Sequence, residues 1–108
     1  MTKITITYEG KNYTLAYSRE SVRMIEQTGF DIGKIESMPA TMIPQLFYGA
    51  FAMYHKGIKR KQVDEIWKSM SKKDELIVVL VEMYSETIED LLGENEDNTK
   101  NATWEVSQ

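Results

Sequence analysis

The chain has 108 residues, of which 42% are hydrophobic and 28% are charged, as is ordinary for one soluble globular domain. It contains no cysteine, which excludes disulfides, thiolate metal sites and cysteine nucleophiles and is compatible with an intracellular setting. The formal net charge of −4 argues against a general nucleic-acid binder, which is usually basic. The alternating first residues are not typical of a signal peptide, and the longest apolar run, residues 76–81, is too short to cross a bilayer.

Residues 3–17 predict a β-hairpin. Apolar side chains alternate with polar ones at positions 4, 6 and 8 and again at 13, 15 and 17, on either side of a Gly-containing turn at residues 9–12. Because an isolated hairpin is only marginally stable in water, we expect its apolar face to pack on the helices that follow.

A first helix is expected over residues 19–28. Ser18 is a good N-cap, and Gly29 is expected to end the helix. With Gly29 in the left-handed conformation, Phe30 can reach back to Ile25, as in a Schellman ending. The next segment, residues 31–38, predicts a short helical turn or an irregular loop.

Residues 41–56 predict a further helix, with Thr41 as its cap and Pro44 in its first turn. The segment is apolar on most sides, which indicates a buried helix. Gly49 would let a neighbouring element approach it closely. A glycine followed by an apolar residue, Gly57-Ile58, is expected to end it.

Two more helices are expected in the second half of the chain. Residues 59–70 place apolar side chains at i, i+3, i+4 and i+7, which is amphipathic spacing. Ser71 is expected to cap a last helix that runs to Leu92 and is closed by Gly93. Its apolar run, residues 76–81, has the propensity of a strand, but the helical periodicity continues to Leu92, so length favours a helix.

These elements indicate an α+β fold that is mainly helical, with an N-terminal β-hairpin packed on a bundle of four to five helices. Residues 1–93 are expected to form one compact domain, and residues 94–108 a flexible acidic C-terminal tail. The last helix is apolar beyond one stripe around Val78 and Val79. These valines are expected either to be buried beneath the hairpin or to form a contact between copies in a homo-oligomer.

Trp104 is unusual in such a polar tail. Solvated tails are poor in aromatic residues, because they cannot bury enough apolar surface to offset the entropy of ordering. Tryptophan is also enriched at binding hot spots. We therefore predict that segment 102–106, with Val106 beside Trp104, is extended and docks as an anchor on its own domain or on a partner.

The sequence contains no pattern typical of a catalytic or metal site. His55 is the only histidine, and it is expected to be a surface or boundary residue rather than a ligand. Carboxylate pairs such as Asp64 and Glu65 lie on polar helix faces, and no phosphate loop or nucleophile elbow occurs. We predict a non-enzyme with no catalytic residues, no metal and no cofactor.

A basic patch consists of Lys56, Lys59, Arg60 and Lys61. Its last three members open a helix, where positive charge is disfavoured by about 0.3 to 1 kcal/mol each. The patch is either a solvated face or a surface that receives an acidic partner, including the acidic tail of this chain. We assign partner binding to this patch together with Trp104 and Val106.

The two helices on either side of Gly57-Ile58 could also form a helix-turn-helix, as in a small DNA-binding regulator. The second helix would then present Asp64 and Glu65 to the DNA, where both would face phosphate. This charge argues against DNA binding.

Three parts of the sequence are distinctive. They are Tyr17-Ser18-Arg19-Glu20-Ser21-Val22; Leu46-Phe47-Tyr48-Gly49-Ala50-Phe51 with His55-Lys56 and Ile58-Lys59-Arg60-Lys61; and Lys100-Asn101-Ala102-Thr103-Trp104-Glu105. Together they resemble a family of small phage and prophage proteins of Gram-positive bacteria, described as domains of unknown function or as siphophage tail assembly chaperones. The resemblance covers nearly the whole chain.

The resemblance implies a chaperone in the host bacterial cytoplasm that coats the tape measure protein, helps to recruit tail tube subunits and is absent from the finished virion. In such systems a longer form is often made by ribosomal frameshifting. A tape measure protein exposes extended amphipathic helix, so its chaperone needs apolar surface and complementary charge rather than an active site. The alternative is a structural component of the tail, such as a completion or connector protein.

Overall fold

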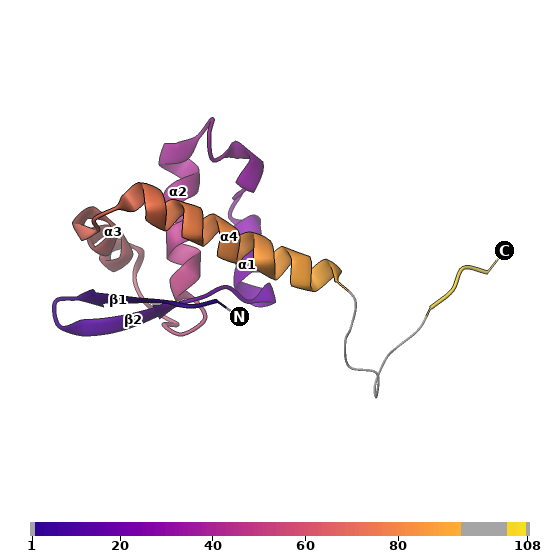
Figure 1. Cartoon of the computed structure of the whole chain (residues 1–108), viewed down its shortest axis with the longest axis horizontal. Coiled ribbons are helices and arrows are strands. Elements are labelled where there is room, and N and C mark those ends of the chain that lie inside the picture. The colour runs from indigo at the N-terminus through magenta and orange to yellow at the C-terminus, as the bar shows by residue number, and fades with distance from the viewer. Residues whose placement is uncertain (1, 94–103, 108) are drawn as a thin grey trace.

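The computed structural model describes residues 2–93 and 104–107, and it places a two-stranded hairpin before a set of helices (Figure 1). The elements in chain order are β1 (Ile4–Tyr8), β2 (Lys11–Leu15), α1 (Arg19–Gln27), the 3-10 turn η1 (Ile32–Lys34), α2 (Pro39–Phe51), α3 (Arg60–Ser69) and α4 (Lys73–Leu92). The predicted α+β, mainly helical fold is confirmed. Within the described ranges, every helix is too short or too polar to cross a membrane.

The hairpin is antiparallel, with Ile4 opposite Leu15 and Tyr8 opposite Lys11. Its turn is tighter than predicted, because only Glu9 and Gly10 lie between the strands. Both have positive φ, 49° and 76°, which is the conformation of a two-residue type I′ turn and explains the glycine.

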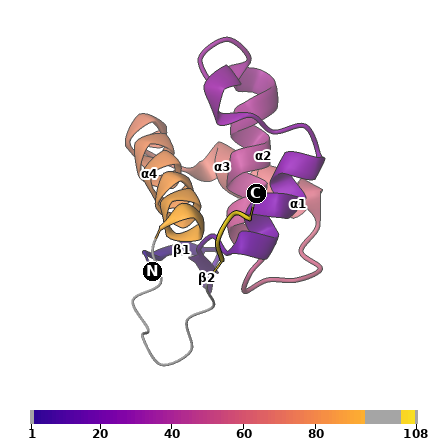
Figure 2. The same ribbon diagram turned by 90° about the vertical axis from the view of Figure 1, so that its right-hand side faces the viewer.

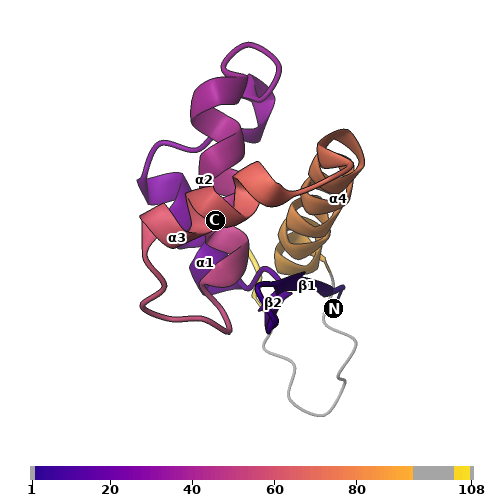
Figure 3. The same ribbon diagram turned by 90° about the vertical axis from the view of Figure 1, so that its left-hand side faces the viewer.

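Helix α2 runs through the centre of the molecule and packs against α1, α3, α4 and β2. Figures 2 and 3 show α4 on one side of α2 and α1 on the other, with the hairpin across one end of the helices. The side chains buried along α2 include Leu46, Phe47, Ala50 and Phe51. Gly49 allows the predicted close approach, since a Cβ at this position would overlap the side chain of Ile25.

Both predicted ends of α1 are confirmed. The Ser21 N–H donates to Ser18 Oγ at 3.1 Å, and the Ser18 N–H donates to Ser21 Oγ at 2.8 Å. The side chain of each serine is therefore the acceptor for the backbone N–H of the other. At the other end Gly29 has a φ of 96°. The Phe30 N–H then donates to the Ile25 carbonyl at 3.3 Å, which is the longer bond of a Schellman ending.

Helix α2 begins earlier than predicted. Thr41 is not its cap: the N–H groups of Thr41 and Met42 both donate to the carbonyl of Met38, at 3.2 and 3.0 Å. Helical hydrogen bonding therefore starts from the carbonyl of Met38, which is the N-cap of the helix. Pro39 takes the first helical position, where its fixed φ fits, and Pro44 lies inside the helix rather than in its first turn.

Helix α2 also ends at Phe51 rather than at Lys56. The carbonyl of Ala50 accepts a hydrogen bond of 3.0 Å from the Ala16 N–H, so the last turn is tied to the chain that leaves β2. Gly57 has a φ of 86°, but it forms a turn within the connection, residues 52–59, and does not end the helix. The predicted helix ending at Gly57-Ile58 is therefore wrong.

Helix α4 extends to Leu92 as predicted, and the run 76–81 is helical. Its cap is Lys72, not Ser71, because the Leu76 N–H donates to the Lys72 carbonyl at 3.0 Å. Lys72 is left-handed, with a φ of 53°. Val78 and Val79 are exposed, Val78 by 57%, so of the two alternatives for these valines, burial beneath the hairpin is wrong.

Candidate binding grooves

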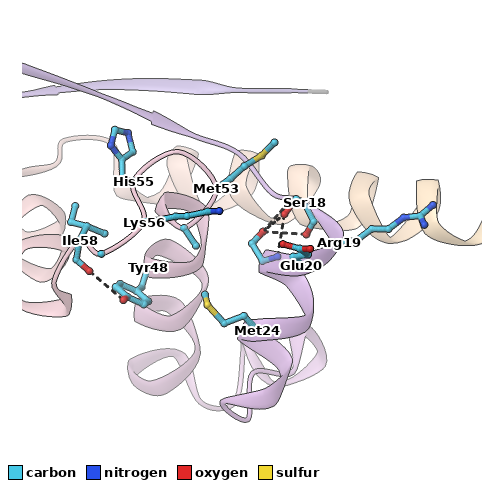
Figure 4. Close-up of a pocket in the computed structure, with 12 residues that line it drawn as sticks. Ser18, Arg19, Glu20, Met24, Tyr48, Met53, His55, Lys56 and Ile58 are labelled. Atoms are coloured by element: carbon cyan, nitrogen blue, oxygen red, sulfur yellow. Dashed lines mark hydrogen bonds between the residues drawn. The ribbon is translucent and has the colours of Figure 1, made fainter.

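A groove of about 760 Å³ opens between the start of α1 and the end of α2, and we call it the first groove (Figure 4). Its walls come from residues 18–21 and 24 at the start of α1, from the last part of α2 with residues 52 and 53, and from the connection at residues 55–58. The volume falls within the range of about 300 to 1,000 Å³ that is usual for ligand pockets.

The interior of the first groove is apolar and adaptable. Its apolar lining residues are Met24, Tyr48, Ala52, Met53 and Ile58. Figure 4 shows Met24 extending from α1 toward Tyr48, whose hydroxyl donates to the Ile58 carbonyl at 3.3 Å. That bond holds the connection against α2. The unbranched methionines can change shape to fit an incoming side chain.

Charged side chains surround the opening of the first groove. Lys56 is exposed and extends toward Ser18 and Glu20 in Figure 4. His55 points the other way, to the hairpin, where its Nε2 accepts the Thr14 N–H at 2.9 Å. His55 is half-buried, as expected for a boundary residue, and this bond gives it a structural role.

A second groove, of about 540 Å³, lies between α2 and α3. Its lining residues are Ala40, Thr41, Pro44, Gln45 and Phe47 from α2, and Arg60, Asp64, Trp67 and Lys68 from α3. The α3 residues recur every three or four positions, so one helix face forms this wall. The ring centres of Phe47 and Trp67 lie 4.8 Å apart in the floor.

The structure divides the predicted basic patch between different surroundings. Lys56 belongs to the first groove and Arg60 to the second, while Lys59 and Lys61 are exposed at the start of α3. Arg60 lies over the Tyr48 ring, 5.1 Å from its centre, and pairs with Asp64 at 3.6 Å. Tyr48 and Arg60 therefore form the partition between the two grooves.

The predicted anchor residues are exposed. Trp104 exposes 85% of its surface and Val106 exposes 75%, so Trp104 has no socket in the described part of its own chain. Residues 104–107 are neither helix nor strand. Ala102 and the acidic stretch 94–101 lie outside the described residues.

The helix-turn-helix alternative required a short connection. Because α2 ends at Phe51 and α3 begins at Arg60, eight residues separate the helices, whereas the DNA-binding motif uses a turn of about three or four residues. Asp64 and Glu65 are both exposed on α3.

Two of the tyrosines with a raised pKa belong to the core. Burial, with a smaller contribution from Tyr84, raises the pKa of Tyr17 well above its ordinary value, and burial raises the pKa of Tyr84 to about 12. Neither tyrosine lines a groove. Across residues 2–93 and 104–107, no group of three or more His, Asp or Glu side chains is placed to hold a metal ion.

A family model described as "Domain of unknown function (DUF5055)" matches residues 1–108. The chain belongs to this family. Searches of curated proteins and of solved structures found no match. For this DUF5055 member the two grooves and the exposed tail residues are the features from which a function can be argued.

Sequence reasoning missed the residues that shape the first groove of this DUF5055 domain. Met24 belongs to α1 and Met53 follows α2, and nothing in either local pattern indicates that they share a wall. An available signal was the placement of Met24 outside the apolar stripe of its helix. Gln45 was also missed: its Oε1 is buried without a hydrogen-bond partner among the described residues.

Proposed function

We propose that this protein is a non-enzymatic chaperone of phage tail assembly, which binds the tape measure protein and helps to recruit tail tube subunits in the host cytoplasm. The observation that carries the proposal is the second groove, whose two walls are faces of α2 and α3. The resemblance of the sequence to tail assembly chaperones supplies the identity of the partner.

The second groove has the chemistry of a helix-binding site. An amphipathic helix places its apolar face in such a groove through residues spaced at i, i+3, i+4 and i+7. Pro44 and Trp67 are partly exposed and offer apolar surface, and Arg60 and Lys68 lie on the α3 wall. These cations favour a helix with acidic residues beside its apolar stripe. A tape measure segment of that kind is the expected ligand.

The test is co-expression of this chain with the tape measure gene of the same phage or prophage. We expect the two proteins to co-purify and the tape measure protein to gain solubility. Lys68→Glu should reduce the co-purified amount, because it reverses a charge at the groove. Arg23→Glu is the matched control, since Arg23 is exposed on α1 and lies in neither groove. If the unaltered chain captures no tape measure protein, the proposal is wrong.

A structural tail protein is the alternative, and virion composition separates the two functions. Mass spectrometry of purified virions should not find this chain if it acts as a chaperone. Its presence in stoichiometric amount would identify a completion or connector protein instead.

A further inference from the structure

We infer that the first groove is the docking site for residues 104–106 of a second copy of this chain. Two surfaces of the same molecule lack a cover: the groove between α1 and the end of α2, and the side chains of Trp104 and Val106. The inference does not involve the tape measure protein, so it is tested on the purified chain alone.

The groove matches the needs of an indole ring. A docked tryptophan requires apolar surface for its ring and an acceptor for its N–H. Met24 and Met53 supply flexible thioethers, which make favourable contacts with aromatic rings. The Glu20 carboxylate at the opening is an available acceptor.

The tail segment presents its side chains in the order that this groove requires. In an extended segment Trp104 and Val106 point to one side and Glu105 to the other. With the two apolar side chains in the groove, Glu105 lies at the opening, where Lys56 is exposed. Charge complementarity therefore extends beyond the apolar contact.

The charges on either side of the contact extend this match. The sequence before Trp104 contains Glu94, Glu96 and Asp97 against Lys100 alone. Lys59 and Lys61 follow the last lining residue of the groove, Ile58, in the sequence, and both are exposed. A tail that enters the groove brings acidic sequence to the lysine-rich side of another molecule, which speeds association and favours this orientation.

The occupant comes from a second molecule because the chain leaves its own tail uncovered. Trp104 remains 85% exposed in the single chain while the first groove stays open. A contact between the groove of one copy and the tail of another joins two different surfaces, so it is heterologous. The copy that supplies its groove keeps its tail free for another contact, and the copy that supplies its tail keeps its groove free.

Two variants, each with one defective surface, test the inference by complementation. Trp104→Ala removes the anchor, and its exposure means that folding is preserved. Met24→Glu puts a carboxylate in the groove, where it repels Glu105, and Met24 is itself 36% exposed. Met38→Glu is the matched control, because Met38 is also exposed but lies in neither groove.

Light scattering after size-exclusion chromatography gives the readout. The unaltered chain and Met38→Glu should self-associate with rising concentration. Trp104→Ala and Met24→Glu should each weaken that association about thirtyfold or more, as expected for a hot-spot residue. An equimolar mixture of these two variants should form one-to-one dimers, since one supplies an intact groove and the other an intact tail.

The same experiment contains the results that would overturn the inference. A monomeric unaltered chain excludes it, even if Trp104 is then shielded within its own molecule. Association that survives Trp104→Ala assigns the contact to another surface, such as Val78 and Val79. If circular dichroism shows that Met24→Glu is unfolded, Lys56→Glu replaces it in the mixture. A mixture of folded variants that stays monomeric also excludes the inference.

Discussion

The Tyr17 hydroxyl donates a hydrogen bond of 2.7 Å to the carbonyl of Leu46 from a buried position. Tyr17 follows β2 and Leu46 lies in the middle of α2, so the bond joins the end of the hairpin to the central helix. The Tyr17 ring also packs edge-on against Tyr84 of α4, with 5.7 Å between ring centres. One side chain thus connects three elements.

Tyr17→Phe should lower the free energy of unfolding by about 1 to 2 kcal/mol, because it removes this hydrogen bond and keeps the ring. Urea denaturation followed by circular dichroism measures the change. Tyr54→Phe is the control, since Tyr54 is exposed and its hydroxyl should contribute little. Equal stability of the two variants would contradict the prediction.

Stability should fall at alkaline pH. The folded state raises the pKa of Tyr17 well above 10 and that of Tyr84 to about 12, in both cases mainly by burial. An unfolded tyrosine ionises near pH 10, so the unfolded chain loses its phenolic protons first and is favoured as the pH rises further. The contribution of these two phenols to the free energy of unfolding is complete below pH about 10 and decreases from there through pH about 12.

Denaturation curves at pH values on either side of about 10 test this dependence. Tyr84→Phe removes one of the phenols whose pKa is raised and should make the decline shallower. A free energy of unfolding that is constant across that range would show that these phenols ionise equally well in the folded chain.

Gly49→Ala should destabilise the fold by about 1 to 3 kcal/mol, because the added methyl group overlaps the buried Ile25 side chain. The gain in helix propensity, about 1 kcal/mol, offsets only part of this cost. Combining it with Ile25→Val should cost less than the sum of the two single changes, and a double-mutant cycle measures the difference. Strict additivity would mean that the two residues do not meet.

His55→Leu should lower the free energy of unfolding by about 1 to 3 kcal/mol, since the Thr14 N–H loses its acceptor in a partly buried place. Leucine retains apolar contact with Tyr13, whose ring centre lies 5.2 Å from the imidazole. Thermal unfolding gives the measurement, with Lys56→Gln as the exposed neighbouring control. A stable His55→Leu variant would reduce the hydrogen bond to a minor contact.

Local signals predicted most of the fold correctly. The alternation of the hairpin, the Ser18 cap and the Gly29 ending depend on residues close together in the sequence, and each is present. The end of α2 could not be predicted in this way. It depends on hydrogen bonds from Thr14 to His55 and from Ala16 to Ala50, which exist only after the hairpin has docked.

The candidate site was less accessible to sequence reasoning than the fold. The basic residues were found, but the partition that Tyr48 and Arg60 form depends on a cation-π contact between helices. The first groove depends on the distance between α1 and the connection after α2, which no local pattern encodes. The exposed Trp104 was the informative signal, because its environment in the sequence could not explain it.

The bonds that join the hairpin to α2 also bear on the expected order of folding events. Thr14 pairs with a residue 41 positions away and Tyr17 with one 29 positions away, so each bond closes a long loop and carries its entropic cost. A hairpin turn forms in about 1 to 10 μs and a helix in less, whereas these bonds need α2 to be present. We therefore expect docking of the hairpin onto the completed α2 to be the late step, and the slower one because its contacts are long-range.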